Sequence, residues 1–131
     1  MTGRVSGVEW VMRILSAILL LAIGGIHLYL VPYGAGSVLG VLFTLNGIGG
    51  IVLAIAVLAL RGRLLQLAVI LALLFALASL LSLLSALTVG LFGITEVWSF
   101  PLVPQTVVVD AIAVVVLAVT TWAVFRRRRT A

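Results

Sequence analysis

Two long stretches of this chain, residues 14–60 and 64–95, carry no formally charged side chain. A helix needs about 20 apolar residues to cross the roughly 30 Å hydrocarbon core of a bilayer, so each stretch has more than enough apolar length for a crossing. The composition agrees, because 65% of the residues are hydrophobic and 8% are charged, whereas soluble domains have about 45–50% apolar and about 25% charged residues. We therefore expect an integral membrane protein, and neither a water-soluble nor a disordered chain.

The positions of turn residues divide the apolar sequence into four predicted spans. Pro-Tyr-Gly-Ala-Gly at residues 32–36 interrupts the first stretch, and the short turn at residues 61–63 precedes the second. The last apolar segment contains Asp110, and a helix starting after this residue would be only about 22 Å long. We therefore start it near residue 105. The prediction is a single all-α domain, an antiparallel four-helix membrane bundle with spans at about 13–31, 37–60, 64–92 and 105–125.

The arginines predict how this bundle is oriented. They precede the first span, join the second to the third, and follow the fourth, so four spans bring all of them to one side of the membrane. The positive-inside rule then predicts that both termini are cytoplasmic (N-in/C-in) in a multi-pass protein of the plasma membrane. The predicted topology anchors are Arg4, Arg13, Arg61, Arg63, Arg126, Arg127, Arg128 and Arg129. We expect the tail to attract anionic lipid and not nucleic acid.

The first apolar run, residues 14–31, superficially resembles a signal peptide behind its arginines. It is longer than the usual apolar region of about 7–15 residues, which favours a retained first span. Cleavage near the small residues 34–37 stays an alternative.

Small residues on the first two predicted helices indicate how the bundle is held together. Apolar burial does not drive helices together in lipid, so close packing and interhelical hydrogen bonds must do so. The predicted packing residues are Gly24, Gly25, Gly36, Gly40, Gly47 and Gly50. A Gly-x-x-x-Gly pattern is common in apolar segments and is only a weak indication of dimerisation.

Each predicted helix contributes a polar group to the half of the bundle away from the arginines. His27 lies about 7 Å and Asp110 about 9 Å from the corresponding helix ends. Asn46 falls near the midplane, and the third helix provides Ser82 and Ser85. An ionisable residue in a membrane is costly and indicates a functional site by default. We therefore predict a polar pocket or relay in which Asp110 pairs with His27, with Asn46 and Ser85 as further partners.

A purely structural role is the alternative for each of these polar residues. His27 then bonds a carbonyl or a serine, and Asp110 caps the fourth helix or reaches interfacial water. Asn46 contributes an interhelical hydrogen bond worth about 1 kcal/mol. Glu96 belongs to a solvated loop, and Glu9 to a short interfacial segment before the first span.

The residues that catalysis and cofactor binding need are mostly missing. The chain has no cysteine, one histidine and three acids, whereas a zinc site takes three or four such ligands. Haem ligation by two histidines would need a second copy of the chain. No nucleotide-binding glycine pattern follows a strand, and no nucleophile has a base in reach. We therefore expect no metal and no cofactor, and an enzyme is disfavoured.

Two short motifs carry a resemblance to other membrane proteins. Residues 25–30 read Gly-Ile-His-Leu-Tyr-Leu and residues 42–46 read Leu-Phe-Thr-Leu-Asn. This pattern resembles that of uncharacterised small four-span membrane proteins from actinobacteria, which have His-Leu in the first helix and Leu-Phe-x-Leu-Asn in the second. The resemblance covers about the first half of the chain and implies that His27 and Asn46 belong to one feature. It implies no activity.

Three functions follow as hypotheses. The sequence favours a subunit, assembly factor or stabiliser of a larger membrane complex, because almost no chain is left outside the predicted helices. Its partners would be other membrane subunits or a second copy of the chain. The second hypothesis is a small transporter or proton-linked binding protein with an outward-facing polar pocket. The third, an enzyme acting on a lipid or quinone, lacks an acid–base–nucleophile set.

Overall fold

A computed structural model describes residues 5–130 of the chain, and the side chains of residues 5–127. Within this range the chain forms four long α-helices, which confirms the predicted all-α bundle. They are α1 (Gly7–Leu30), α2 (Val38–Ala59), α3 (Gly62–Thr88) and α4 (Val103–Thr130), with a short 3-10 helix η1 (Val31–Gly34) between the first two. Each long helix has the length and apolar composition needed to cross a membrane. The protein is therefore a multi-pass membrane bundle.

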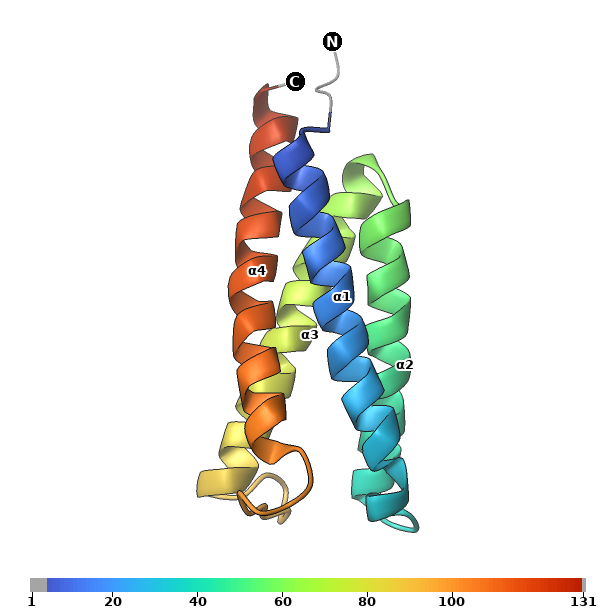
Figure 1. The fold of residues 1–131 in the computed structure, drawn as a ribbon, viewed down its shortest axis with the longest axis vertical. Helices are drawn as coiled ribbons and strands as arrows, with labels where there is room; N and C mark the ends of the chain where they lie inside the picture. The colour runs from blue at the N-terminus through green and yellow to red at the C-terminus, as the bar shows by residue number, and fades with distance from the viewer. Residues whose placement is uncertain (1–4, 131) are drawn as a thin grey trace.

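The four helices stand side by side and alternate in direction along the chain (Figure 1). Helix α1 packs against α2 and α4, and α3 packs against α4 and α2. Among the described residues, α2 and α4 lie diagonally opposite each other and bring no pair of Cα atoms within 8 Å. The start of α1, the end of α4 and the α2–α3 turn lie at one end of the bundle, which we call the arginine end. η1 and the loop of residues 89–102 lie at the other, which we call the loop end.

The helix boundaries differ from the predicted spans for local reasons. α1 begins at Gly7 and not near residue 13, because the Ser6 hydroxyl accepts a hydrogen bond from the Glu9 backbone N–H at 3.0 Å and caps the helix. α3 ends at Thr88 and not near residue 92, because the following Gly90 has φ +90°, which glycine adopts readily. The charges near the start of α1 do not end the helix, since they face the inside of the bundle.

Backbone contacts between glycines join α1 to α2. A Cβ atom on Gly24 would lie 2.9 Å from the carbonyl oxygen of Gly47, and one on Gly50 would lie 2.7 Å from that of Leu20. Gly40 approaches the backbone of Gly34 in the same way. These contacts agree with the packing predicted for Gly24, Gly40, Gly47 and Gly50. Gly25 and Gly36 do not take part, because a Cβ atom on either would meet open space.

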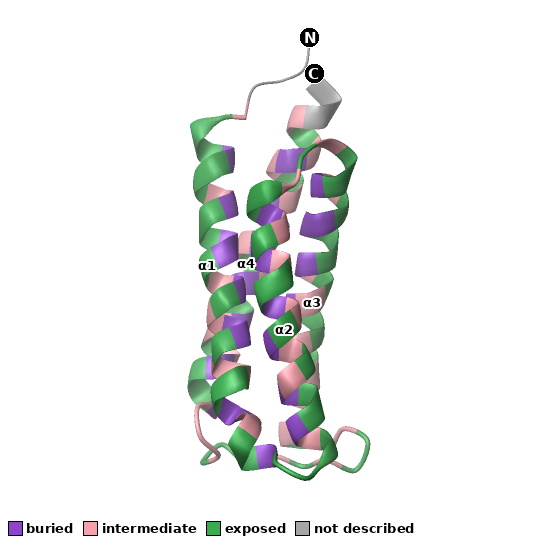
Figure 2. Cartoon of the chain, turned by 90° about the vertical axis from the view of Figure 1, so that its right-hand side faces the viewer, coloured by how far each residue is buried: buried purple, intermediate pink, exposed green. Residues whose placement is uncertain are grey.

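Buried residues form an inward stripe on every helix, and the outward faces are exposed and mostly apolar (Figure 2). The buried apolar core occupies the half of the bundle nearer the arginine end. It comprises Ala17, Leu20, Ile23, Ala54, Val57, Leu65, Val69, Ala72, Ala76, Ala113, Leu117 and Val124. At the loop end the packing is interrupted by a cavity.

Candidate functional site

A cavity of about 660 Å³ lies inside the loop end of the bundle. All four helices and the 89–102 loop contribute to its wall, which is mainly aliphatic and aromatic. The polar side chains in the wall are His27, Asn46, Ser79, Ser82, Glu96 and Thr106. An apolar cavity with a few converging polar groups is the usual form of a small-molecule site, and this volume lies within the common range of about 300–1,000 Å³.

The His27 side chain is hydrogen-bonded to its own helix and also lines the cavity. Its Nδ1 atom lies 2.7 Å from the carbonyl oxygen of Ile23, one turn earlier in α1. The ring also packs edge-on against Phe43 of α2, with the centroids 5.6 Å apart. His27 is therefore fixed by a backbone carbonyl, as in the structural alternative, and still faces the predicted pocket.

Asn46 joins α2 to α3 across the cavity wall. Its amide nitrogen donates a hydrogen bond to the Ser79 hydroxyl at 3.2 Å. Its Oδ1 atom is buried and has no hydrogen-bond partner. The interhelical contact predicted for Asn46 is present, but its partner is Ser79 and not a residue proposed from the sequence. The free Oδ1 atom leaves this amide half satisfied.

Asp110 of α4 is fully buried, with 0% of its surface exposed, and is not part of the cavity wall. Neither carboxyl oxygen has a hydrogen-bond partner. The Ser79 hydroxyl of α3 is close enough to act electrostatically on this carboxyl. Thr106, one turn earlier in α4, lines the cavity and donates to the carbonyl of Leu102 at 2.6 Å. Asp110 is therefore near Ser79, a polar residue of the wall, without lining the cavity itself.

The structure brings together only part of the predicted pocket. His27, Asn46 and Ser82 line one cavity, as expected. The predicted pairing of Asp110 with His27 is wrong in this structure, because the Asp110 carboxyl has no hydrogen bond and His27 binds the Ile23 carbonyl. Ser85 lies outside the described cavity wall. Three-residue spacing turns successive side chains about 60° around a helix, so Ser79 and Ser82 face the cavity while Ser85 turns away.

Glu96 is a half-buried member of the cavity wall and not a freely solvated loop residue. Its backbone N–H donates to the Ala86 carbonyl at 2.8 Å and ties the loop to the end of α3. Burial raises the pKa of its carboxyl above the ordinary value of 4.5, and a hydrogen bond involving the Val97 backbone opposes this increase. Glu96 places a second carboxyl at the loop-end side of the cavity.

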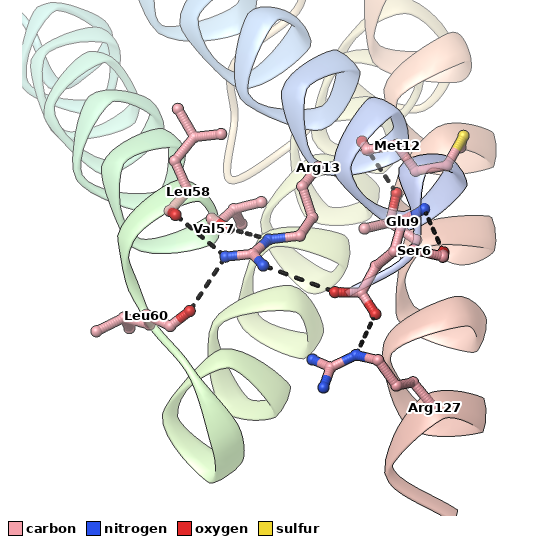
Figure 3. Close-up of polar contacts among 9 residues, drawn as sticks. Ser6, Glu9, Met12, Arg13, Val57, Leu58, Leu60 and Arg127 are labelled. Atoms are coloured by element: carbon pink, nitrogen blue, oxygen red, sulfur yellow. Dashed lines mark hydrogen bonds and ion pairs between the residues drawn. The ribbon is translucent and has the colours of Figure 1, made fainter. Parts of the chain in front are cut away.

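A separate ionic cluster lies at the arginine end (Figure 3). Glu9 is 1% exposed, and its Oε1 atom accepts a hydrogen bond from Nε of Arg127 at 2.6 Å. Its Oε2 atom lies 3.6 Å from Nη1 of Arg13. The cluster joins the start of α1 to the end of α4, which are far apart in the sequence. Glu9 therefore lies within α1 and inside the bundle, and not in a separate segment before the first helix.

Arg13 also binds the end of α2. Its guanidinium donates to the backbone carbonyls of Val57, Leu58 and Leu60 at 2.8, 3.1 and 3.1 Å. The last carbonyls of a helix have no partner within the helix, and a cation at this end also interacts favourably with the helix dipole. Arg13 is 2% exposed, so it caps α2 inside the bundle and is not a lipid-facing anchor.

The other predicted anchors have mixed surroundings. Arg61 and Arg63 are exposed beside the α2–α3 turn, and Arg126 stacks on the Trp122 ring, with its Cζ atom 5.0 Å from the centroid. Arg4 and the side chains of Arg128 and Arg129 lie outside the described residues.

Sequence reasoning missed Ser79 as a member of the site and Glu9 with Arg13 as a buried pair. The i,i+4 spacing of Glu9 and Arg13 was an available signal for an ion pair on one helix face. The contact with Arg127 depends on how α1 and α4 are placed side by side, which no local pattern shows.

Comparisons of the chain with protein-family models, with curated proteins and with solved structures give no match. The resemblance to small actinobacterial membrane proteins therefore stays a prediction.

Proposed function

We propose that this protein is a small-molecule binding protein or transporter of the membrane, with the loop-end cavity as its binding site. The observation that carries the proposal is a cavity of about 660 Å³ that residues from all four helices and one loop line. A bundle selected only for stability would fill such a volume, because each unfilled methylene-sized space costs packing energy. Here the other half of the same bundle is closely packed.

The polar groups support a binding role more than a catalytic one. His27, Asn46 and Ser79 converge on the cavity from three helices, and such a small number of placed polar groups orients a ligand in an apolar site. The described cavity wall contains no nucleophile with a base in hydrogen-bond reach, so the geometry gives no support to lipid or quinone chemistry. The role of subunit or assembly factor stays a prediction, since no partner surface is identified on the described residues.

The orientation of the bundle in the membrane is part of the same proposal. Arg13, Arg61, Arg63, Arg126 and Arg127 all lie at the arginine end. With this end in the cytoplasm, the positive-inside rule is obeyed and anionic lipid can bind the exposed arginines. The cavity then faces the outer half of the plasma membrane, and both termini are cytoplasmic.

A pocket-filling variant tests the binding role. The purified protein in detergent is first screened for thermal stabilisation by a panel of small amphipathic compounds, since a ligand that binds only the folded state raises its stability. Ser82→Phe then places an aromatic ring in the cavity wall. We expect this variant to lose the stabilisation that the best compound gives to the unchanged protein.

Leu81→Phe is the matched control, because Leu81 is the neighbouring residue on the exposed face of α3. It should retain the full ligand-induced shift. Stabilisation of Ser82→Phe as large as that of the unchanged protein, or no stabilisation by any compound in the panel, would overturn the proposed function.

A further inference from the structure

The cavity wall reaches the outward faces of α2 and α3. Leu42 of α2 belongs to the wall and is 40% exposed, and Ala78 of α3 is an exposed wall residue as well. Ala78 lies one helical turn from both Leu74 and Leu81, whose side chains are also exposed. The cavity is therefore bordered, at the seam between α2 and α3, by residues on the outer surface of the bundle.

The α2–α3 seam is closed on the side of the arginine end. A Cβ atom on Gly49 of α2 would lie 3.1 Å from the Cε1 atom of Phe75 of α3. One turn nearer the loop end, the Asn46 amide donates a hydrogen bond to the Ser79 hydroxyl at 3.2 Å. Beyond these contacts the two helices line the cavity with Leu39, Leu42, Ser82 and Leu83. An opening at this seam therefore lies between the Asn46–Ser79 hydrogen bond and the loop end.

This part of the seam lies at membrane depth. Ala78 precedes the last residue of α3 by ten residues, which places it about 15 Å from that end of the helix. Helix α3 has 27 residues, so it is about 40 Å long and exceeds the hydrocarbon core by roughly 10 Å. Even if this excess all protrudes at the loop end, Ala78 remains within the hydrocarbon. The seam is therefore bordered on its outer side by lipid and not by water.

The polar groups that the cavity presents near the seam are uncharged. Ser79 and Ser82 place hydroxyl groups there, and a hydroxyl can both donate and accept a hydrogen bond. The described wall contains no arginine, and its one acidic residue, Glu96, belongs to the 89–102 loop. A charged molecule that entered through the seam would have to pass through hydrocarbon, which is costly. An uncharged molecule avoids this cost.

We propose that the loop-end cavity opens sideways between α2 and α3 and binds an uncharged, chain-like molecule that is dissolved in the bilayer. This proposal rests on the proposed function and names its ligand class and the route of entry. The hydroxyl or carbonyl end of the molecule enters first and bonds to the hydroxyl groups of Ser79 and Ser82. Its apolar chain lies against the aliphatic and aromatic wall and leaves the cavity beside Ala78.

Photoreactive lipids of one chain length and different charge test the proposal in vesicles of phosphatidylcholine. The probes are hexadecanol, hexadecyltrimethylammonium and hexadecyl sulfate at trace levels, each carrying a diazirine group near the polar end. After illumination, mass spectrometry identifies the labelled residues of α3. The wall residues compared are Phe75, Ser79 and Ser82, and the outward residues are Leu74 and Leu81. We expect the alcohol to label the wall at least about tenfold more than the outward face, a preference equivalent to about 1.4 kcal/mol, and the charged probes to show no such preference.

A variant at the proposed entrance tests the route. Ala78→Trp places a large ring beside the seam without removing a polar group, and should lower the labelling of Ser79 and Ser82 by the alcohol at least about tenfold. Ala111→Trp is the matched control, because Ala111 is exposed on α4 and lies outside the described cavity wall. It should leave the labelling unchanged.

Equal labelling of wall and outward residues by the alcohol would show that only bulk lipid surrounds the helices, and would overturn the proposal. Wall labelling by a charged probe as strong as that by the alcohol, or full labelling of the Ala78→Trp variant, would also overturn it. The pattern on the unchanged protein decides the ligand class even where Ala78→Trp fails to fold. The proposed function is tested separately by the compound screen with Ser82→Phe, so it stands if that screen is positive while the lipid labelling fails.

Discussion

The guanidinium of Arg127 lies 2.6 Å from the carboxylate of Glu9, so the last turns of α4 are bonded to the first turns of α1. The same carboxylate faces Arg13, which in turn binds the carbonyls at the end of α2. One buried acid thus links three helices at the arginine end.

Glu9→Gln should destabilise the folded bundle strongly. The substitution leaves the buried Arg13 without its carboxylate, and removing one partner of a buried ion pair typically costs about 3–5 kcal/mol. The loss is measurable as a lower free energy of unfolding in mixed micelles with increasing denaturing detergent. Glu96→Gln makes the same chemical change at a half-buried loop position and should cost less than about 1 kcal/mol. Equal effects of the two substitutions would contradict the role assigned to Glu9.

Gly24→Ala should weaken the contact between α1 and α2. The added Cβ atom would lie 2.9 Å from the Gly47 carbonyl oxygen, and overpacking of this kind costs about 1–3 kcal/mol. The neighbouring Gly25→Ala puts the same atom into open space, where replacing glycine within a helix should stabilise it by about 0.5–1 kcal/mol. Thermal unfolding of the two variants measures the difference. A Gly25→Ala variant less stable than Gly24→Ala would show that this interface is packed differently.

Glu96 should make the protein more stable in acid than in neutral solution. Burial raises the pKa of this carboxyl in the folded state, so the folded protein holds the proton more tightly than the unfolded chain does. Its stabilising contribution is complete below the ordinary pKa of 4.5 and is lost as the pH rises through the raised pKa of the folded state. The difference in unfolding free energy between the unchanged protein and Glu96→Gln, measured from pH 4 to about 7, isolates this contribution. The unfolding free energy of the unchanged protein, relative to that of Glu96→Gln, should fall as the pH rises. A relative stability that increases with pH would contradict the burial of this carboxyl.

Single cysteines should be labelled from opposite sides of the membrane. The chain has no natural cysteine, so Arg63→Cys at the arginine end and Thr95→Cys in the 89–102 loop each give one reactive position. Both residues are exposed. In intact cells a membrane-impermeant maleimide should label position 95 and not position 63, which should react only after the membrane is opened. Labelling of position 63 in intact cells would reverse the proposed orientation.

The number and type of helices were predictable from the sequence because bilayer crossing requires long apolar segments, and residues 14–60 and 64–95 supply them. The contacts of Gly24 and Gly50 were also indicated, since small residues mark close helix approach in lipid. The contact partners of the polar residues were not predictable from the sequence. Whether Asp110 meets His27 or lies behind Ser79 depends on the rotation of α4 about its axis. A rotation of one residue, about 100°, changes the partner and leaves the sequence pattern unchanged.

The role of a charged residue near a helix end was also not predictable from the sequence. Arg13 has the sequence position of a topology anchor, yet it lies inside the bundle on the carbonyls of α2. Arginine before an apolar run is compatible with both roles. Only the arrangement of α1 beside α2 distinguishes them.

The uneven filling of the bundle has a mechanical consequence. Regions with few buried apolar contacts open locally at lower free energy than closely packed ones. The arginine end has the apolar core and the ionic cluster, so we expect it to open locally at a higher free energy than the loop end, which contains the cavity. Under the proposed function, the 89–102 loop and the adjoining helix ends are the parts that would move when a ligand enters, while the packing at the arginine end stays unchanged.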